Sequence, residues 1–220
     1  AVEAVLFGAN GASDHLAAGS VVVDCSTIAP ATAIASAQRL AQRGVHYLDA
    51  PVTGGTEGAK AGSLTVLVGG EPAALERARP VLEIIGGSIH HFGAVGRGQQ
   101  VKAVNQVLVA GSYAAVAEAM ALGQRLGLPM DAVVTALQGG AAGSWALSHR
   151  ATSMLTASYP LGFRMSLHHK DLGIALDAAG DVNLDLPVTQ LVAELENGLM
   201  EKGHGDEDVS ALHRHFGTKS

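Results

Sequence analysis

Three polar side chains interrupt a long apolar segment near the middle of the chain. Lys102, Asn105 and Gln106 lie in the sequence VKAVNQVLVAGSYAAVAEAMALG, which is otherwise rich in Val, Ala, Leu and Met. If the segment is helical, their spacing places all three on one face, with Cβ atoms about 5–6 Å apart. We expect so apolar a helix to be buried on nearly every side. Because burying an ammonium and two amides is costly, this face predicts a wet or ligand-filled cleft.

A glycine-rich segment supplies a second set of polar groups. The sequence DAPVTGGTEGAKAG follows an apolar stretch that is typical of a buried strand. Segments in that position leave the sheet at its carboxyl edge, where α/β proteins bind ligands. Thr53 offers a hydroxyl, and Gly54 and Gly55 allow backbone N–H groups to converge on an anion without obstruction by a Cβ. The alternative is a tight turn into the next strand, LTVLVGG.

For several other polar residues, a purely structural role is an alternative to a role in a functional site. In DCSTIAP, Ser26 or Thr27 would ordinarily cap the helix that follows. Lys170, which precedes Asp171 and LGIALDAA, fits a helix start with an acid in its first turn. Lys102 taken alone fits a solvated lysine on a helix surface. None of these motifs decides a function by itself.

The composition limits the class of protein. The chain has 220 residues, of which 48% are hydrophobic and 15% charged, as in a globular protein. A net charge of −6 with scattered Lys and Arg provides no basic patch for nucleic acid. No uninterrupted apolar run reaches the ~18 residues of a membrane span, so we expect no membrane partner. The ten histidines include no pair with zinc-ligand spacing, so no metal site is predicted.

The single cysteine, Cys25, cannot form a disulfide within the chain, which fits a reducing, cytoplasmic setting. We expect it to be a small buried residue at the end of a strand.

The order of patterns predicts two domains. Residues 1–92 alternate between strand and helix patterns, which predicts an α/β domain with a parallel crossover. Residues 93–220 carry long Ala- and Leu-rich periodic stretches, which predict an all-α domain. A long helix over residues 99–126 is expected at the junction, where small-molecule sites often lie. Strands are expected at residues 19–27, 45–52, 64–70 and 88–93, and helices of the first domain at residues 30–44 and 71–86.

Taken in order, the motifs resemble the β-hydroxyacid dehydrogenase family, which includes 3-hydroxyisobutyrate dehydrogenase and tartronate semialdehyde reductase. The matching segments are VLFGANG, VVVDCSTIAP, YLDAPVTGGTEGAKAGSLTVLVGG, GAVGRGQQVKAVNQ, GGAAGSW and FRMSLHHKDLGIALDAA. The resemblance implies a Rossmann-type doubly wound domain, present in part, followed by an all-α domain. It also implies an NAD- or NADP-dependent oxidoreductase that interconverts a small 3-hydroxy acid and its 3-oxo acid, working as a homo-dimer or homo-tetramer.

The resemblance also assigns roles to residues. Lys102 is similar to the catalytic lysine, and Thr53, Gly54 and Gly55 to the residues that hold the substrate carboxylate. Asn105 and Gln106 would orient the substrate, and Thr27 and Lys170 would approach the nicotinamide end of the cofactor. An unperturbed lysine, with a pKa of about 10.4, is protonated at neutral pH and can give a proton to the oxygen of a reduced carbonyl.

One family motif is missing from the sequence. The Gly-x-Gly-x-x-Gly turn that receives the pyrophosphate has no match, and GAVGRG has different glycine spacing. We therefore expect the chain to start partway through the dinucleotide-binding domain, as a truncated form.

Gln106, GGAAGSW and FRMSLHHKDL are most similar to tartronate semialdehyde (2-hydroxy-3-oxopropionate) reductase, with 3-hydroxyisobutyrate dehydrogenase as the alternative. A decarboxylating sugar-phosphate dehydrogenase would need a basic cluster, for which Arg150 and Arg164 are the candidates. A remnant without cofactor, acting as a helical oligomerisation module, is the alternative outside enzymes.

Overall fold

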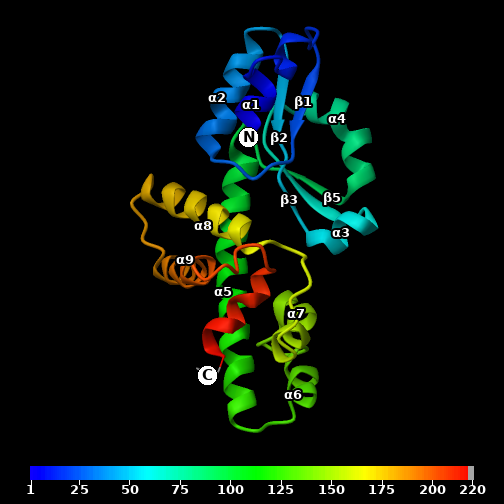
Figure 1. Ribbon diagram of the computed structural model, residues 1–220. Helices are drawn as coiled ribbons and strands as arrows, with labels where there is room; N and C mark the ends of the chain where they lie inside the picture. The colour runs from blue at the N-terminus through cyan, green and yellow to red at the C-terminus, as the bar shows by residue number, and fades with distance from the viewer. Residues whose placement is uncertain (218–220) are drawn as a thin grey trace. The chain divides into compact units, whose positions relative to one another are not determined.

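The computed structural model describes residues 1–217, which form two compact units (Figure 1). The first unit is Ala1–Asn105 and the second begins at Gln106. Helix α5 (Arg97–Arg125) contains this boundary. The division predicted from composition, at residues 92 and 93, precedes that helix and stays a prediction.

The first unit is built from alternating strands and helices. Its elements are α1 (Val2–Phe7), a 3-10 turn (Ala12–Asp14), β1 (Val21–Asp24), α2 (Pro30–Ala41), β2 (His46–Asp49), β3 (Val52–Thr53), α3 (Gly55–Ala61), β4 (Leu64–Val68), α4 (Pro72–Ile85) and β5 (Gly86–His91). Strands β1 and β2 are parallel, as the crossover pattern predicted. Strand β4 pairs with β5 in parallel and with β3 in the antiparallel sense. The mixed α/β architecture with a Rossmann-like region is therefore confirmed.

The two faces of the β1–β2 sheet pack against different helices, because side chains alternate along each strand. Val22 and Tyr47 pack in a core with α2, while Val21, Val23 and Leu48 pack in a core with α4. Because successive residues of a strand point to opposite faces, one short apolar strand fills both cores. Figure 1 shows α1 and α2 on one side of these strands and α4 on the other. Helices on both faces are the doubly wound arrangement.

Backbone hydrogen bonds join the end of β2 to the end of β4. Asp49 N donates to the Gly69 carbonyl over 3.1 Å, and Gly69 N donates back to the Asp49 carbonyl over 2.8 Å. The glycine-rich segment that follows β3 is not the turn that we considered: it contains the seven-residue helix α3. Gly62 ends this helix in the left-handed conformation, with φ +62°.

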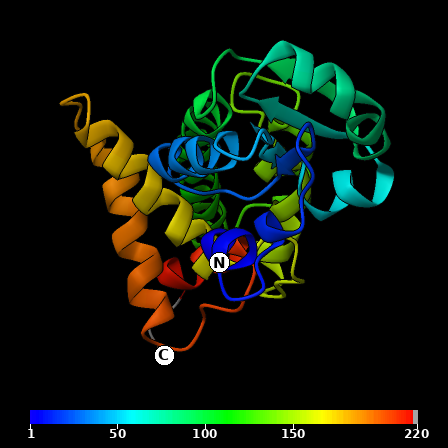
Figure 2. The ribbon, with the colours of Figure 1, turned by 90° about the horizontal axis from the view of Figure 1, so that it is seen from above.

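The described part of the second unit is helical. After α5 come α6 (Met130–Leu137), α7 (Trp145–Leu155), α8 (Met165–Gly180), α9 (Pro187–Met200) and the 3-10 segment η2 (Val209–Phe216). α8 and α9 lie side by side (Figures 1 and 2). One core joins α5 to α7, and another joins α5 to α8, α9 and η2. The prediction that a helical region follows the α/β region is confirmed, and η2 is a 3-10 helix.

Helix α5 is less buried than its composition predicted. Val104, Leu108 and Leu122 are 62%, 70% and 59% exposed, so the expectation of a helix buried on nearly every side is wrong. By length and composition alone α5 could cross a membrane, since one 18-residue window has a mean hydropathy of 1.3 and is 44% buried. Core helices of soluble proteins meet the same criteria, so this composition is weak evidence for a membrane span.

A buried polar pair joins α8 to α9. Nδ1 of His168 and Oε1 of Glu196 share a hydrogen bond of 2.6 Å, and both side chains are 0% exposed. The His168 ring also meets the edge of Phe163, with ring centroids 5.3 Å apart. A buried pair of this kind is costly to break, because the residue that remains loses its partner in a place that water does not reach.

We predict that Glu196→Leu lowers the free energy of unfolding by about 3 kcal/mol, because it leaves the His168 imidazole buried without its acceptor. The double variant His168→Leu with Glu196→Leu should be more stable than the single variant. Urea denaturation followed by circular dichroism measures both. Equal stability of the single variant and the wild type would show that the pair contributes nothing.

Candidate active site

Lys102 lies in the interior of the first unit and points at the strand before the glycine-rich segment. Its side chain is 8% exposed, and Nζ donates a hydrogen bond of 2.9 Å to the backbone carbonyl of Val52 in β3. The next residue is Thr53. The alternative of a solvated surface lysine is therefore wrong. An ammonium group carries three donors, and the carbonyl of Val52 takes one of them.

The residues after Val52 have an unusual backbone. Gly54 and Gly55 have φ values of +131° and +65°, and both are exposed. Residues with a side chain rarely adopt these backbone conformations, so glycine is required for the backbone to turn here. Because neither glycine carries a Cβ, the backbone N–H groups of this segment are not shielded by side chains of their own. Lys102 is thus hydrogen-bonded to the residue that directly precedes Thr53, Gly54 and Gly55, and their shared role in one site stays a prediction.

Asp49 fixes the start of the helix that carries Lys102. Its carboxylate accepts hydrogen bonds from Gly96 N over 2.8 Å and from Gln99 N over 2.9 Å, and the residue is 0% exposed. Burial raises the pKa of Asp49, while the backbone N–H groups of Gly96 and Gln99 lower it. A Cβ on Gly98 would clash with the Leu67 carbonyl, so only glycine fits between the helix and the sheet.

A second carboxylate organises the turn after β1. Asp24 accepts a hydrogen bond of 2.9 Å from Ser26 N and one of 2.7 Å from the hydroxyl of Tyr47. Burial and then the bond to Asp24 raise the pKa of Tyr47, so its hydroxyl remains a donor. Thr27, one residue beyond this turn, is half-buried. The N-cap of α2 is Ala29, so neither Ser26 nor Thr27 caps that helix, and that alternative is wrong.

Cys25, in the same turn, departs from the prediction. It follows directly on the end of β1, as expected, but it is exposed and not buried. No group of three or more His, Cys, Asp or Glu residues within 1–217 could hold a metal ion.

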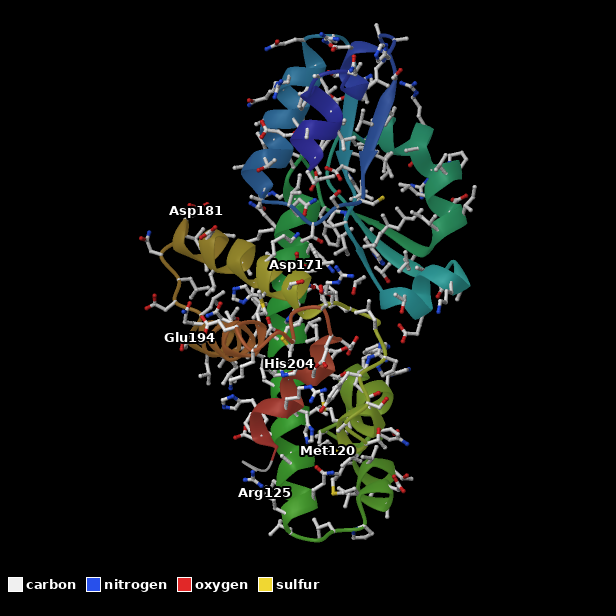
Figure 3. All side chains as sticks on the ribbon, in the orientation of Figure 1. Met120, Arg125, Asp171, Asp181, Glu194 and His204 are labelled. Carbon is white, nitrogen blue, oxygen red and sulfur yellow. The ribbon has the colours of Figure 1, made fainter. Side chains whose placement is uncertain are left out.

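In the second unit, Asp171 brings two of the predicted residues together. Its carboxylate accepts a hydrogen bond of 2.9 Å from Nε2 of Gln106 and lies 2.9 Å from Nζ of Lys170. Figure 3 shows Asp171 on α8, where this helix crosses α5. Helix α8 begins at Met165 with no acid in its first turn, so the alternative of a helix start at Lys170 is wrong. Asn105, the residue before Gln106, is half-buried on α5.

Two organising residues, Asp49 and Asp171, were not among the predicted site residues. Asp171 follows Lys170 directly, and its place within the motif HHKDLG was the only available signal. Asp49 acts on Gly96 and Gln99, which lie 47 and 50 residues further along the chain. No local pattern marks such a contact.

Two family models match the chain. The model described as NAD-binding of NADP-dependent 3-hydroxyisobutyrate dehydrogenase matches residues 96–216. The model described as the NAD binding domain of 6-phosphogluconate dehydrogenase matches residues 1–93.

Curated proteins and solved structures give the same result. The 2-(hydroxymethyl)glutarate dehydrogenase of Eubacterium barkeri is 38% identical over 96% of this chain and 70% of that protein. The 2-hydroxy-3-oxopropionate reductase of Escherichia coli K12 is 39% identical over 96% of this chain and 72% of that protein. The crystal structure of 3-hydroxyisobutyrate dehydrogenase from Salmonella typhimurium has a TM-score of 0.90 and 33% identity, and the match covers 97% of this chain and 74% of that one.

The fold and these matches define an oxidoreductase of hydroxy acids that uses NAD or NADP. Within that class, the chain belongs to the β-hydroxyacid dehydrogenase family.

We predict that Asp49→Ala destabilises the protein by about 3 kcal/mol, because two buried backbone N–H groups lose a charged acceptor. Asp49→Asn should lose less, since its amide oxygen can still accept one bond. Thermal denaturation measures both. Asp14→Ala is the control: it removes only a surface pair with Arg43, at 2.9 Å, and should cost less than about 1 kcal/mol. Equal losses in Asp49→Ala and Asp14→Ala would contradict the role of Asp49.

Proposed function

We propose that the protein reduces a short, unphosphorylated 3-oxo acid of the tartronate semialdehyde type, with Lys102 as the proton donor. The observation that carries the proposal is the position of Lys102, whose Nζ lies 2.9 Å from the carbonyl of Val52, next to Thr53 and Gly54. This places a buried ammonium beside a segment whose hydroxyl and open N–H groups suit a carboxylate. A small acid held by that segment would present its carbonyl oxygen to the ammonium.

The chemistry follows from these groups. When bound, the reduced nicotinamide supplies a hydride to the carbonyl carbon. The carbonyl oxygen gains negative charge, and Lys102 stabilises that charge and transfers a proton to the oxygen. Thr53, Gly54 and Gly55 hold the carboxylate, and Asn105 and Gln106 orient the remainder of the substrate from the same face of α5. Solvent then returns a proton to Lys102.

Two residues have the chemistry to meet the nicotinamide end of NAD or NADP. Thr27 follows the carboxyl end of the parallel strand β1, the edge at which dinucleotides bind in doubly wound sheets. Its hydroxyl is a donor and an acceptor. Lys170 is 48% exposed and is held by Asp171, so its ammonium has a defined place. These features fit the cofactor, and the two residues would orient it toward the substrate.

The two candidate arginines for a phosphate have other contacts. Nε of Arg150 lies 3.5 Å from Asp208, and its guanidinium stacks on Trp145 at 4.6 Å. Arg164 lies 3.4 Å from Asp206 and is about half exposed. Both side chains thus face carboxylates, which disfavours a phosphorylated sugar as the substrate and favours a short acid.

The second candidate is oxidation of 3-hydroxyisobutyrate, which the match to the Salmonella typhimurium enzyme favours. The amide of Gln106, paired with the buried carboxylate of Asp171, suits a substrate with an extra hydroxyl better than one with a methyl group. The identity to the Escherichia coli 2-hydroxy-3-oxopropionate reductase supports the same choice.

We predict that kcat/KM for tartronate semialdehyde exceeds kcat/KM for 3-hydroxyisobutyrate by at least about tenfold, since a substrate hydroxyl can hydrogen-bond to the amide of Gln106 and a methyl group cannot. Absorbance at 340 nm, with NADH and NADPH for reduction and NAD and NADP for oxidation, measures both. The reverse ratio would favour the second candidate. A folded protein that neither binds the cofactor nor turns over either acid would favour a remnant that serves as a helical oligomerisation module.

We predict that Lys102→Ala lowers kcat by about 10³-fold, because no other group replaces the proton donor. Affinity for the cofactor should stay within twofold of the wild type, as measured by the fluorescence of the reduced nicotinamide. Lys202→Ala, which removes an exposed lysine at the end of α9, is the matched control and should keep the wild-type kcat. A Lys102→Ala variant that retained half of the wild-type kcat would refute this role.

A further inference from the structure

The side-chain amide of one residue on α5 holds the turn after β1. Nε2 of Gln99 donates a hydrogen bond of 2.8 Å to the carbonyl of Ser26, and Oε1 of Gln99 accepts one of 3.2 Å from the N–H of Ile28. The two bonds are made on either side of Thr27. Gln99 is 1% exposed, so water does not compete for these bonds. The amide thus holds the backbone of two residues, Ser26 and Ile28, which flank Thr27.

The main chain of Gln99 is itself fixed. Its N–H donates to Oδ2 of Asp49 over 2.9 Å, so the end of β2 sets where the side chain starts. Lys102 follows three residues later on the same helix, which is one turn further along and on the same face. The distance between the turn after β1 and Lys102 is therefore set through a single residue.

Gln99 acts together with other contacts of this turn, since Ile28 also packs against the core that contains Leu40 and Tyr47. Cys25 and Ser26 are exposed, and the bond from Ser26 N to Asp24 fixes only its first part. The bond from Ile28 N to Gln99 holds the part after Thr27. Loss of the amide would remove the hydrogen bond of Ile28 N, while the bond from Ser26 N to Asp24 would remain.

We propose that Gln99 is a positioning residue: it holds Thr27 at a set distance from Lys102, so that the nicotinamide and the proton donor meet the same carbonyl group. This inference rests on the proposed function, in which Thr27 meets the cofactor and Lys102 the substrate. Only an amide of this length can donate to Ser26 and accept from Ile28. Leucine does neither, and glutamate keeps the acceptor but not the donor.

The experiment compares Gln99→Leu with Gln100→Leu. Gln100 is the exposed neighbour, and its side-chain oxygen accepts a hydrogen bond of 2.9 Å from the guanidinium of Arg97 on the first turn of α5. Hydrogen–deuterium exchange with mass spectrometry on the cofactor-free protein reports the backbone of residues 24–29. We expect Gln99→Leu to exchange about fivefold faster there, since one amide hydrogen bond is lost. Residues 97–102 should be unchanged, and Gln100→Leu should match the wild type in both segments.

The variant Gln99→Glu provides a second test of the inference if the Gln99→Leu protein does not fold. It keeps the volume and the acceptor for Ile28 N, so its exchange at residues 24–29 should lie between those of the wild type and Gln99→Leu. Exchange equal to the wild type in every folded Gln99 variant would overturn the inference.

Steady-state kinetics separate positioning from simple support of the fold. In Gln99→Leu we expect kcat to fall by at least about tenfold, because misplaced reacting groups slow the transfer, while KM for the carboxylic acid stays within twofold. Faster exchange with an unchanged kcat and an unchanged KM for the cofactor would overturn the positioning role.

A failure of the proposed function would look different. Wild-type protein would then turn over neither acid, while exchange and the binding of reduced nicotinamide, followed by its fluorescence, would still report on Gln99. Weaker binding by Gln99→Leu than by Gln100→Leu would support its action on the Thr27 turn, and equal binding would overturn it.

Discussion

The carboxylate of Asp49 is the contact on which the placement of Lys102 depends. It stands at the end of β2 and accepts the N–H groups of Gly96 and Gln99, so the first turn of α5 is tied to the sheet. The positive end of the helix dipole meets a negative charge there, away from water. A helix fixed at its first turn has a fixed rotation about its axis. That rotation directs Lys102 toward the carbonyl of Val52 and not toward solvent.

Much of the fold could be predicted from local patterns in the sequence. Continuous β-branched runs predicted β1 and β4, proline and glycine bounded α2, and periodic Ala and Leu predicted the helices after Asn105. The apolar neighbours of Lys102 favoured a cleft over a fully solvated position, and the side chain is indeed only 8% exposed. Each of these features depends on residues close together in the chain, which is why a sequence pattern records it. The roles of Lys102, Thr27 and the other predicted site residues rest on the family resemblance and stay predictions.

Local sequence patterns could not predict contacts between residues that are far apart in the chain. Asp49 acts on residues 47 or more positions away, and Asp171 accepts a bond from Gln106, 65 positions away, so local patterns did not record either contact. The glycine-rich segment contains helix α3, because Gly55 and Gly62 provide its ends while Thr56–Ala61 suit a short helix. The exposure of Leu108 was also missed, since composition indicates how apolar a helix is but not which of its faces are covered.

The position of Cys25 makes it a natural attachment point for a spectroscopic reporter. It is the only cysteine in the chain, it is exposed, and it lies in the turn that Gln99 holds. Its thiol pKa is raised, first by partial shielding of the sulfur from water and then by the Asp24 carboxylate. A thiol-reactive fluorophore would therefore couple best under alkaline conditions, and at one site only. The wild-type chain can thus carry a dye two residues from Thr27 without any cysteine being added or removed.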